Sequence, residues 1–329
     1  MTKTMRAVEF DGAGGPEVIR VVKRPRPEAG PGEVLVKVAA AGLNRADVQQ
    51  RRGVYPPPPG ASDIPGLEVS GTIAALGRDV HGHVAGASVC ALLAGGGYAE
   101  YVAVPAGQVL PVPGNTGLVE AAALPEVTCT VWSNLFMEAG VVPGDWVLIH
   151  GGAGGIGTMA TQMVAAFGAH PVVTAGSGEK LEYCRGFGAE AGINYRNDDF
   201  VERMREFSLG HGADVILDVV GATYLDRNLR ALAPGGRLVV IGLQGGSKSE
   251  LDLRILMSRR ARVIGTTLRA RPVEEKAQIV AQVKEHVWPL IEANTVRTAV
   301  EARYRLEDAV EAHEHFDSGR HVGKILLTM

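Results

Sequence analysis

A glycine-rich turn is the part of the sequence whose residue types and spacing most clearly predict chemistry. Gly152-x-Gly154-x-x-Gly157 follows a short apolar run, Trp146–Ile149, and precedes apolar residues at helical spacing. In such a turn one glycine permits the tight bend, another lets the backbone approach a pyrophosphate, and the third lets the helix pack closely on the strand. The N–H groups at the start of the helix then bind phosphate. The spacing alone is a weak signal, because an ordinary glycine-rich connection also satisfies it.

The residues after the turn strengthen the prediction, because they alternate between strand and helix patterns. This rhythm is typical of a doubly wound parallel sheet, whose ligand lies at the carboxyl ends of the strands. The turn then belongs to the first strand of a complete dinucleotide-binding set. The predicted strands are 146–149, 172–175, 191–195, 215–220, 238–242 and 262–268, and the predicted helices are 180–187, 200–207, 224–233 and 251–259. Pro234-Gly235-Gly236 is expected to end the third of these helices.

The tip of the second strand distinguishes the two nicotinamide cofactors. NAD-specific folds place an Asp or Glu about 20 residues after the glycines, where it binds the ribose 2′-hydroxyl. Residues 174–180 here read T-A-G-S-G-E-K, without an acid at the strand tip. Ser177 can donate a hydrogen bond to a 2′-phosphate and Lys180 can supply charge to it. NADPH is therefore favoured over NADH. Two alternatives stay open: Glu179 is the acid in a slipped alignment, and Lys180 is merely a solvated helix residue.

The N-terminal third consists of short predicted strands with glycine and proline turns, which favours a β-barrel-like domain. After residue 268 come a long predicted helix (274–293), a second helix (306–317) and a last strand (324–329). These elements do not continue the α/β rhythm and are expected to close back on the N-terminal domain. We predict a discontinuous catalytic domain, 1–123 with 269–329, and a dinucleotide-binding domain, 124–268.

Composition excludes several partner classes. A net charge of −3 gives no electrostatic reason to expect nucleic acid or an anionic membrane as the main partner. The N-terminus lacks the apolar core of a secretory signal, and the sequence contains no apolar run long enough to span a bilayer. Cys90, Cys129 and Cys184 are far apart and show no pairing pattern. We therefore expect a protein of the reducing cytoplasm.

Several motifs along the whole chain carry a family resemblance. The longest is N-R-A-D-x-x-Q-R-x-G-x-Y-x-P-P-P-G-A-S (44–62). The others are P-G-E-V-L-V-K-V (31–38), P-G-L-E-V-S-G (65–71), G-G-G-Y-A-E-Y (95–101), A-A-A-L-P-E (121–126), the glycine turn and D-V-V-G (218–221). With them the chain resembles the quinone oxidoreductase branch of the medium-chain dehydrogenase/reductase superfamily, and most closely the p53-inducible type of NADPH:quinone oxidoreductase. The resemblance implies a GroES-like β-barrel catalytic domain, a Rossmann coenzyme domain, and a quinone bound in the interdomain cleft over the nicotinamide of NADPH.

The resemblance also implies roles for individual residues. Asn44 would donate a hydrogen bond near the quinone oxygen, although capping the helix that begins there is an alternative. Tyr55 would line the mouth of the cleft, unless it only packs on a proline-rich surface turn. Thr130 would lie close to the nicotinamide amide. The implied cofactor-binding residues are Gly154, Gly155 and Ile156 at the pyrophosphate, Ser177, Lys180 and Tyr195 at the 2′-phosphate, and Gly221, Gly242, Leu243 and Leu268 at the ends of the fourth, fifth and sixth strands.

Zinc is expected to be absent. Zinc-dependent relatives carry a Cys where this chain has Asn44, and a His-Glu pair where it has Leu67-Glu68. An amide and a leucine remove two of the thiolate and imidazole ligands that zinc requires. His313 and His315 are two residues apart on a predicted helix, which points their rings away from each other.

Two other functions compete with quinone reduction. The same scaffold reduces the carbon–carbon double bond of enones or enals with NADPH, a reaction that needs a proton donor such as Tyr55. Relatives also serve as lens crystallins or bind AU-rich RNA, but a purely structural role would leave the cofactor motif without a purpose. Family membership further implies a homodimer in which the sixth strands, residues 262–268, pair at the sheet edge.

Overall fold

The computed structural model describes residues 3–329; the first two residues of the predicted N-terminal domain lie outside this range. The chain divides into two compact units, Met1–Cys129 with Leu268–Met329 and Thr130–Thr267. Each unit has its own apolar core, centred for example on Val36 in the first and Ile216 in the second.

The second unit contains a six-stranded parallel sheet in the order β10-β9-β8-β11-β12-β13. This order reverses direction beside β8, so its carboxyl end is a topological switch point where such sheets bind ligands. The predicted doubly wound sheet is confirmed. The strands are β8 (Trp146–His150), β9 (His170–Ala175), β10 (Ala191–Asn194), β11 (Ala213–Asp218), β12 (Leu232–Val240) and β13 (Arg262–Gly265).

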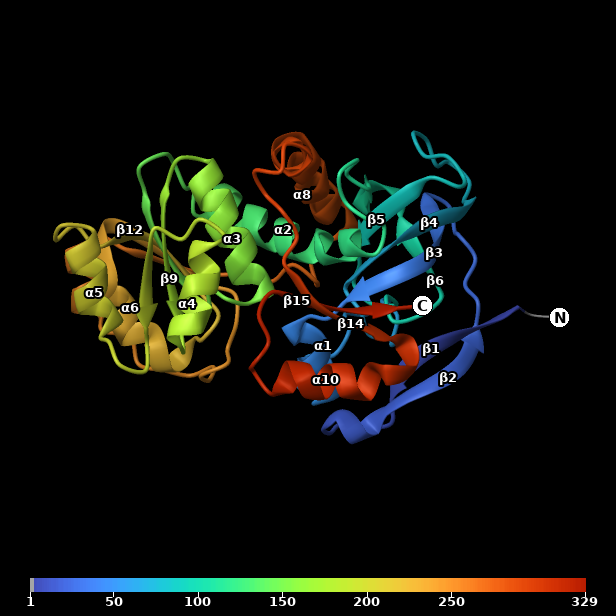
Figure 1. Ribbon diagram of the computed structural model, residues 1–329, viewed down its shortest axis with the longest axis horizontal. Helices are drawn as coiled ribbons and strands as arrows, with labels where there is room; N and C mark the ends of the chain where they lie inside the picture. Colours follow the sequence, from blue (N-terminus) through green and yellow to red (C-terminus); the bar gives the residue numbers. More distant parts are fainter. Residues whose placement is uncertain (1–2) are drawn as a thin grey trace. The chain divides into compact units, whose positions relative to one another are not determined.

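Helices cover both faces of this sheet, with α3 and α4 on one side and α5 and α6 on the other (Figure 1). Right-handed crossovers require this arrangement, because the chain moves outward from β8 to β10 and then returns to β11. The inner strands β8, β9 and β11 are nearly continuous apolar runs because helices bury them on both sides. The helices are α3 (Gly155–Ala166), α4 (Gly178–Arg185), α5 (Phe200–Phe207), α6 (Leu225–Ala231) and α7 (Leu253–Arg259).

The first unit is built on a mostly antiparallel seven-stranded sheet, ordered β14-β15-β3-β4-β5-β7, with β6 pairing β3. Its strands are β3 (Glu33–Gly42), β4 (Glu68–Leu76), β5 (Ser88–Leu92), β6 (Tyr101–Pro105), β7 (Val109–Pro111), β14 (Val300–Arg305) and β15 (Lys324–Thr328). A separate hairpin joins β1 (Thr4–Phe10) to β2 (Ile19–Pro25). Because β15 pairs with β3, the last strand of the chain completes the N-terminal sheet (Figure 1).

The helices of the first unit are α1 (Arg45–Arg51), α8 (Val273–His286), α9 (Trp288–Glu292) and α10 (Ala309–Asp317). The single long helix predicted over 274–293 is wrong, since the helix ends at His286 and a new one begins at Trp288. Pro289 at the start of α9 explains the break, because proline lacks the N–H that a continuous helix needs. Helix α2 (Pro125–Val131) crosses from the first unit into the second and continues as a π-helical segment, Trp132–Glu138.

Two further predictions in the second unit are corrected. Pro234-Gly235-Gly236 does not end α6; it lies inside β12. Leu232 pairs with Ala213 whereas Arg237 pairs with Val215, so the residues between Leu232 and Arg237 bulge out of the ladder and tolerate proline and glycine. The sixth strand ends at Gly265, so Leu268 does not end it and instead belongs to the first unit.

Candidate functional site

The glycine turn joins β8 to α3 in the second unit, and its crowding explains the glycines. A Cβ on Gly157 would lie 2.4 Å from the carbonyl oxygen of Gly151, and one on Gly152 would lie 2.6 Å from the Cβ of Val173. Gly151 itself has a φ of +72°, which favours glycine. The turn can therefore keep this shape only with glycine at these three positions.

Gly154 is the N-cap of α3, and Gly155 and Ile156 are its first two helical residues. The first N–H groups of a helix have no acceptor within the helix, and the helix dipole makes them favourable for anions. The three predicted pyrophosphate residues thus lie together at a helix N-terminus that faces the switch point of the sheet. This arrangement can bind a phosphate through backbone N–H groups alone.

The ends of β9 and β10 bring together the residues predicted at the 2′-phosphate. Ser177 is the N-cap of α4, where its hydroxyl accepts the backbone N–H of Lys180 at 3.3 Å. Tyr195 follows β10, and its hydroxyl would lie 2.6 Å from a Cβ on Gly176, next to Ser177. Glu179 is exposed on the first turn of α4, which agrees with a solvated acid. Sequence reasoning missed Arg196, whose Nε would lie 3.3 Å from the same Gly176 Cβ.

The ends of β11 and β12 also meet. Gly221 has a φ of +83°, and a Cβ on it would lie 3.1 Å from both the carbonyl oxygen of Gly242 and the Cδ2 atom of Leu243. The carboxylate of Asp218 holds this turn by accepting the N–H groups of Val220 at 2.7 Å and Gly221 at 3.0 Å. Burial raises the pKa of Asp218 to about 6. Asp218 belongs to the D-V-V-G motif, but its role in holding this turn was not predicted, because the two N–H groups it binds are brought to it by the fold.

Thr130 begins the second unit, within α2. Its carbonyl oxygen accepts the side-chain N–H of Asn134 at 2.8 Å, and the Asn134 oxygen accepts the hydroxyl of Thr266 beyond β13. Asn134 thus links α2 to the residues that follow the last strand of the sheet. A nicotinamide contact for Thr130 stays a prediction.

In the first unit, Asn44 lies next to a buried ion pair. The Lys324 ammonium lies 2.5 Å from the Glu68 carboxylate, and both side chains are almost entirely buried. The Asn44 side chain accepts from Lys324 at 2.7 Å and donates to Glu68 at 3.1 Å. β4 begins at Glu68, β15 begins at Lys324 and α1 follows Asn44, so three elements meet at this cluster.

The helix that Asn44 precedes is held by Asp47 rather than by the Asn44 amide alone. The buried Asp47 carboxylate accepts the N–H of Asn44 at 2.8 Å, the N–H of Gly66 at 3.0 Å and the hydroxyl of Tyr98 at 3.0 Å. Burial raises the pKa of Asp47 to about 6, although these three donors oppose the shift. Asp47 was not predicted as a site residue, because the residues it binds are distant in sequence.

Tyr55 is half-buried and is fixed by Arg269, which follows the second unit in the chain. The Arg269 guanidinium lies 5.5 Å from the centre of the Tyr55 ring, and it donates to Gln50 at 2.7 Å and to the carbonyl of Ala94 at 2.8 Å. Desolvation raises the pKa of Tyr55 above its usual range. Arg269 therefore packs beside the Tyr55 ring, and a place for Tyr55 at the substrate stays a prediction.

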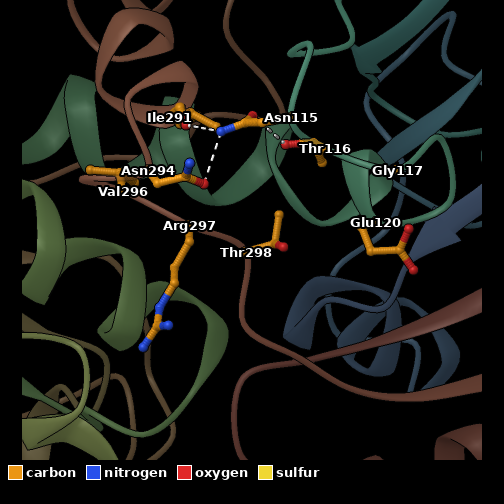
Figure 2. A pocket seen from close by; sticks show the side chains of 9 residues that line it. All are labelled: Asn115, Thr116, Gly117, Glu120, Ile291, Asn294, Val296, Arg297 and Thr298. Atoms are coloured by element: carbon orange, nitrogen blue, oxygen red, sulfur yellow. Dashed lines mark hydrogen bonds between the residues drawn. The ribbon is translucent and has the colours of Figure 1, made fainter.

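A polar hollow of about 260 Å³ lies elsewhere in the first unit (Figure 2). Asn115 crosses its rim, donating to the carbonyl of Ile291 at 2.7 Å and to Asn294 at 2.9 Å. None of the predicted site residues lines it. The hollow is thus separate from the cluster around Asn44.

Both units contain segments that match known protein families. Residues 30–114 match the alcohol dehydrogenase GroES-like domain, and residues 155–285 match the zinc-binding dehydrogenase family. These features define an oxidoreductase of the medium-chain dehydrogenase/reductase superfamily, with a GroES-like domain and a Rossmann domain. The rat quinone oxidoreductase is 31% identical over 99% of this chain and 98% of its own length. The chain belongs to the quinone oxidoreductase family.

Solved structures agree with this assignment. A mycobacterial quinone oxidoreductase has a TM-score of 0.84 and 32% identity, covering 99% of this chain and all of that one. The Escherichia coli quinone oxidoreductase in complex with NADPH has a TM-score of 0.86 and 28% identity over the same shares.

The matching family is described as zinc-binding, but the side chains at the corresponding place in this chain are poor zinc ligands. Among residues 3–329, no three His, Cys, Asp or Glu side chains are grouped so that they could hold a metal ion. The place beside Glu68 is taken by the Lys324 ammonium, and Asn44 and Leu67 are not zinc ligands. His313 is fully buried against Arg51 whereas His315 contacts Tyr304, which confirms that the two rings diverge. The described side chains around Asn44 and Glu68 do not fit a zinc site.

Proposed function

We propose that this protein reduces quinones with NADPH and without a metal, as the p53-inducible type of NADPH:quinone oxidoreductase does. The observation that carries the proposal is the glycine turn between β8 and α3, whose helix N-terminus can bind a phosphate, in a chain related to quinone oxidoreductases over its full length. The motif at residues 44–62, which resembles that of the p53-inducible type, supports this choice within the family. The nicotinamide supplies the reducing chemistry when bound.

The cofactor is proposed to be NADPH rather than NADH. β9 ends at Ala175 without an acid, and Ser177, Lys180 and Tyr195 would surround the 2′-phosphate in this proposal, since Ser177 caps α4 and Tyr195 lies beside Gly176. Arg196 adds a second nearby cation. The E. coli relative was solved with NADPH, which supports the same choice here.

The quinone is proposed to lie over the nicotinamide, with Asn44 donating to its oxygen, Tyr55 beside it and Thr130 near the nicotinamide amide. Quinones are already strong acceptors of electrons or hydride, so hydrogen bonds to the quinone oxygen suffice to polarise it. An amide N–H can supply such a bond, and the buried surroundings of Asn44 strengthen it.

A homodimer through the edge of the second unit's sheet is part of the proposal. Among residues 3–329, β13 pairs with β12 and with no other strand, and Val263 on it is 42% exposed. Leu253 and Met257 on the neighbouring α7 are also exposed. An unpaired apolar edge favours association with a second copy.

A cytoplasmic location is likewise proposed, because Cys90, Cys129 and Cys184 are buried free thiols. No helix within residues 3–329 is long and apolar enough to cross a membrane.

The test is steady-state oxidation of NADPH and NADH by the purified protein, with 1,4-benzoquinone, 9,10-phenanthrenequinone and an enone in parallel. We expect NADPH-selective turnover of the quinones that a zinc chelator does not change. Lys180→Ala should remove the selectivity, whereas Glu179→Ala, the adjacent exposed residue, should keep it. Turnover of the enone alone would instead show a double-bond reductase. NADPH binding without any turnover would favour a non-enzymatic role.

A further inference from the structure

The ion pair between Lys324 and Glu68 has no part in the chemistry proposed so far. Both groups are almost completely buried, at 5% and 0% side-chain exposure. Removing two charges from water is costly and is often not recovered as stability, so such a pair suggests a role beyond holding strands together.

The ammonium of Lys324 has three hydrogens and three acceptors. It donates to Glu68, to the carbonyl oxygen of Leu43 at 2.8 Å and to the Oδ1 atom of Asn44 at 2.7 Å. The other oxygen of Glu68 accepts the backbone N–H of Glu126 at 2.9 Å. All three N–H donors of the ammonium are therefore used, and hydrogen bonds hold both the ammonium and the carboxylate in place.

Gly42 shows how closely this carboxylate is seated. A Cβ on Gly42 would lie 2.2 Å from the Oε1 atom of Glu68 and 2.9 Å from the carbonyl oxygen of Ala122. The carboxylate thus lies directly on the backbone of β3, where only glycine leaves room for it. Glu68 has little freedom to move away from Asn44.

The two charges determine which way the Asn44 amide faces. An amide can usually turn over with little change in shape, and its oxygen and nitrogen exchange places. Here the turned amide would place N–H groups against the Lys324 ammonium and its oxygen against the Glu68 carboxylate. Both contacts would be repulsive, so a single orientation is stable.

In that orientation the amide nitrogen keeps one weakly used hydrogen. The amide nitrogen donates one hydrogen to Glu68 at 3.1 Å. Its other hydrogen points to the carbonyl oxygen of Gly42 at 3.3 Å, which is longer than a usual N–H···O bond and therefore weak. The amide oxygen, in contrast, is committed to Lys324. Asn44 can therefore offer a donor to a further group but not an acceptor.

We propose that Lys324 and Glu68 are positioning residues that lock the Asn44 amide, so that Asn44 presents only N–H to a bound carbonyl substrate. This inference rests on the proposed function, in which Asn44 donates to a quinone oxygen. A quinone oxygen accepts hydrogen bonds and would be repelled by an amide oxygen. The ion pair thus selects for substrates that present an acceptor at this place.

The first experiment observes the amide directly and does not depend on activity. The seven asparagines of the chain are labelled with ¹⁵N, and the Asn44 side-chain signals are assigned by their loss in Asn44→Ala. We expect slow exchange of these protons with water in the unsubstituted protein and faster exchange, with a changed shift, in Lys324→Met. Lys37→Met, an exposed lysine on the same sheet, is the matched control and should change neither. Unchanged Asn44 signals in Lys324→Met would overturn the proposal.

The second experiment asks whether Lys324 acts through Asn44. With saturating NADPH, Asn44→Ala and Lys324→Met should each lower kcat/KM for 1,4-benzoquinone about tenfold, as loss of one hydrogen bond predicts. The double variant should be no worse than Asn44→Ala, and the Kd for NADPH should stay unchanged. Losses that multiply in the double variant would contradict the positioning role.

Glu68→Gln is the second variant if Lys324→Met does not fold, because it keeps the size of the side chain and removes the charge that holds the amide. It should show the same change in the Asn44 signals, and unchanged signals would overturn the proposal equally. If the unsubstituted protein does not reduce quinones, the proposed function is wrong, and the NMR result still decides whether the amide is locked.

Discussion

Gly157→Ala is the substitution that most sharply tests the role of the turn between β8 and α3. The added Cβ would meet three backbone atoms, the nearest being the Gly151 carbonyl oxygen at 2.4 Å and the Gly152 Cα at 2.5 Å. Because ordinary contacts are about 3.5 Å, the helix and the turn must separate by about 1 Å. Backbone atoms cannot turn aside as a side chain can, so the N-terminus of α3 must move.

The displacement removes phosphate contacts from the start of α3. Hydrogen bonds to charged groups contribute about 1.5–3 kcal/mol each, so loss of two should weaken NADPH binding at least about a hundredfold. Crowding in a packed region should also lower the free energy of unfolding by about 1–3 kcal/mol. NADPH titration by calorimetry measures the first effect, and urea unfolding of the cofactor-free protein measures the second.

Gly114→Ala is the matched control, since it adds the same methyl group at an exposed turn of the first unit, away from the predicted cofactor residues, where no atom lies within 4 Å. We expect its affinity and stability to remain close to those of the unsubstituted protein. NADPH binding by Gly157→Ala within about threefold of that protein, a difference under about 1 kcal/mol, would refute the reasoning.

Three further predictions concern stability and assembly. His150 bridges Thr174 at 3.1 Å and Asn228 at 2.8 Å, and burial lowers its pKa to about 4. As the pH falls below about 6.5, the His150 imidazole is therefore protonated in the unfolded chain before it is protonated in the folded one. Between pH 7 and 4, the free energy of unfolding from urea titrations should fall by up to about 3 kcal/mol more in the unsubstituted protein than in His150→Gln. Parallel plots of this free energy against pH for the two proteins would exclude the prediction. Asp47→Asn should lower the free energy of unfolding by about 2 kcal/mol, because an amide cannot accept hydrogen bonds from all three donors. A melting temperature equal to that of the unsubstituted protein would count against this prediction. Val263→Lys should convert the expected dimer to a monomer in light scattering, and a dimer that persists would place the interface elsewhere.

The second unit could be predicted largely from sequence because its inner strands, β8, β9 and β11, are apolar on both faces. Each run stands out from the polar helices around it, and right-handed crossovers then leave few possible strand orders. β12 was misjudged at its start, since Pro234-Gly235-Gly236 has the composition of a turn. Only the ladder with β11 shows that these residues form a bulge.

β14 was missed altogether, although V-E-A-R-Y-R alternates as a half-exposed strand does. Its charged residues resemble a loop when read alone, and its partner β15 is 19 residues further on from the end of β14. Parallel pairing with β15 stabilises it only in the folded chain. Edge strands of this kind depend on tertiary contacts more than on their own pattern.

The candidate site divides in the same way. The glycines of the turn were predictable, because their role is set by the local backbone. The lock on Asn44 was not, since Lys324 lies 280 positions away and a lysine before an apolar strand is usually solvated. Asp47 and Asp218 were missed for a similar reason, because each holds a turn by accepting backbone N–H groups that only folding brings to it.

The most direct measurement of the central claim is a single turnover. The protein, treated with a zinc chelator and loaded with an equal amount of NADPH, is mixed rapidly with 1,4-benzoquinone while the absorbance of the reduced nicotinamide is followed. We predict that the absorbance disappears in one fast phase, far faster than with free NADPH, and that protein loaded with NADH reacts more weakly. Persistence of the signal in NADPH-loaded protein, with the cofactor shown to be bound, would contradict the account.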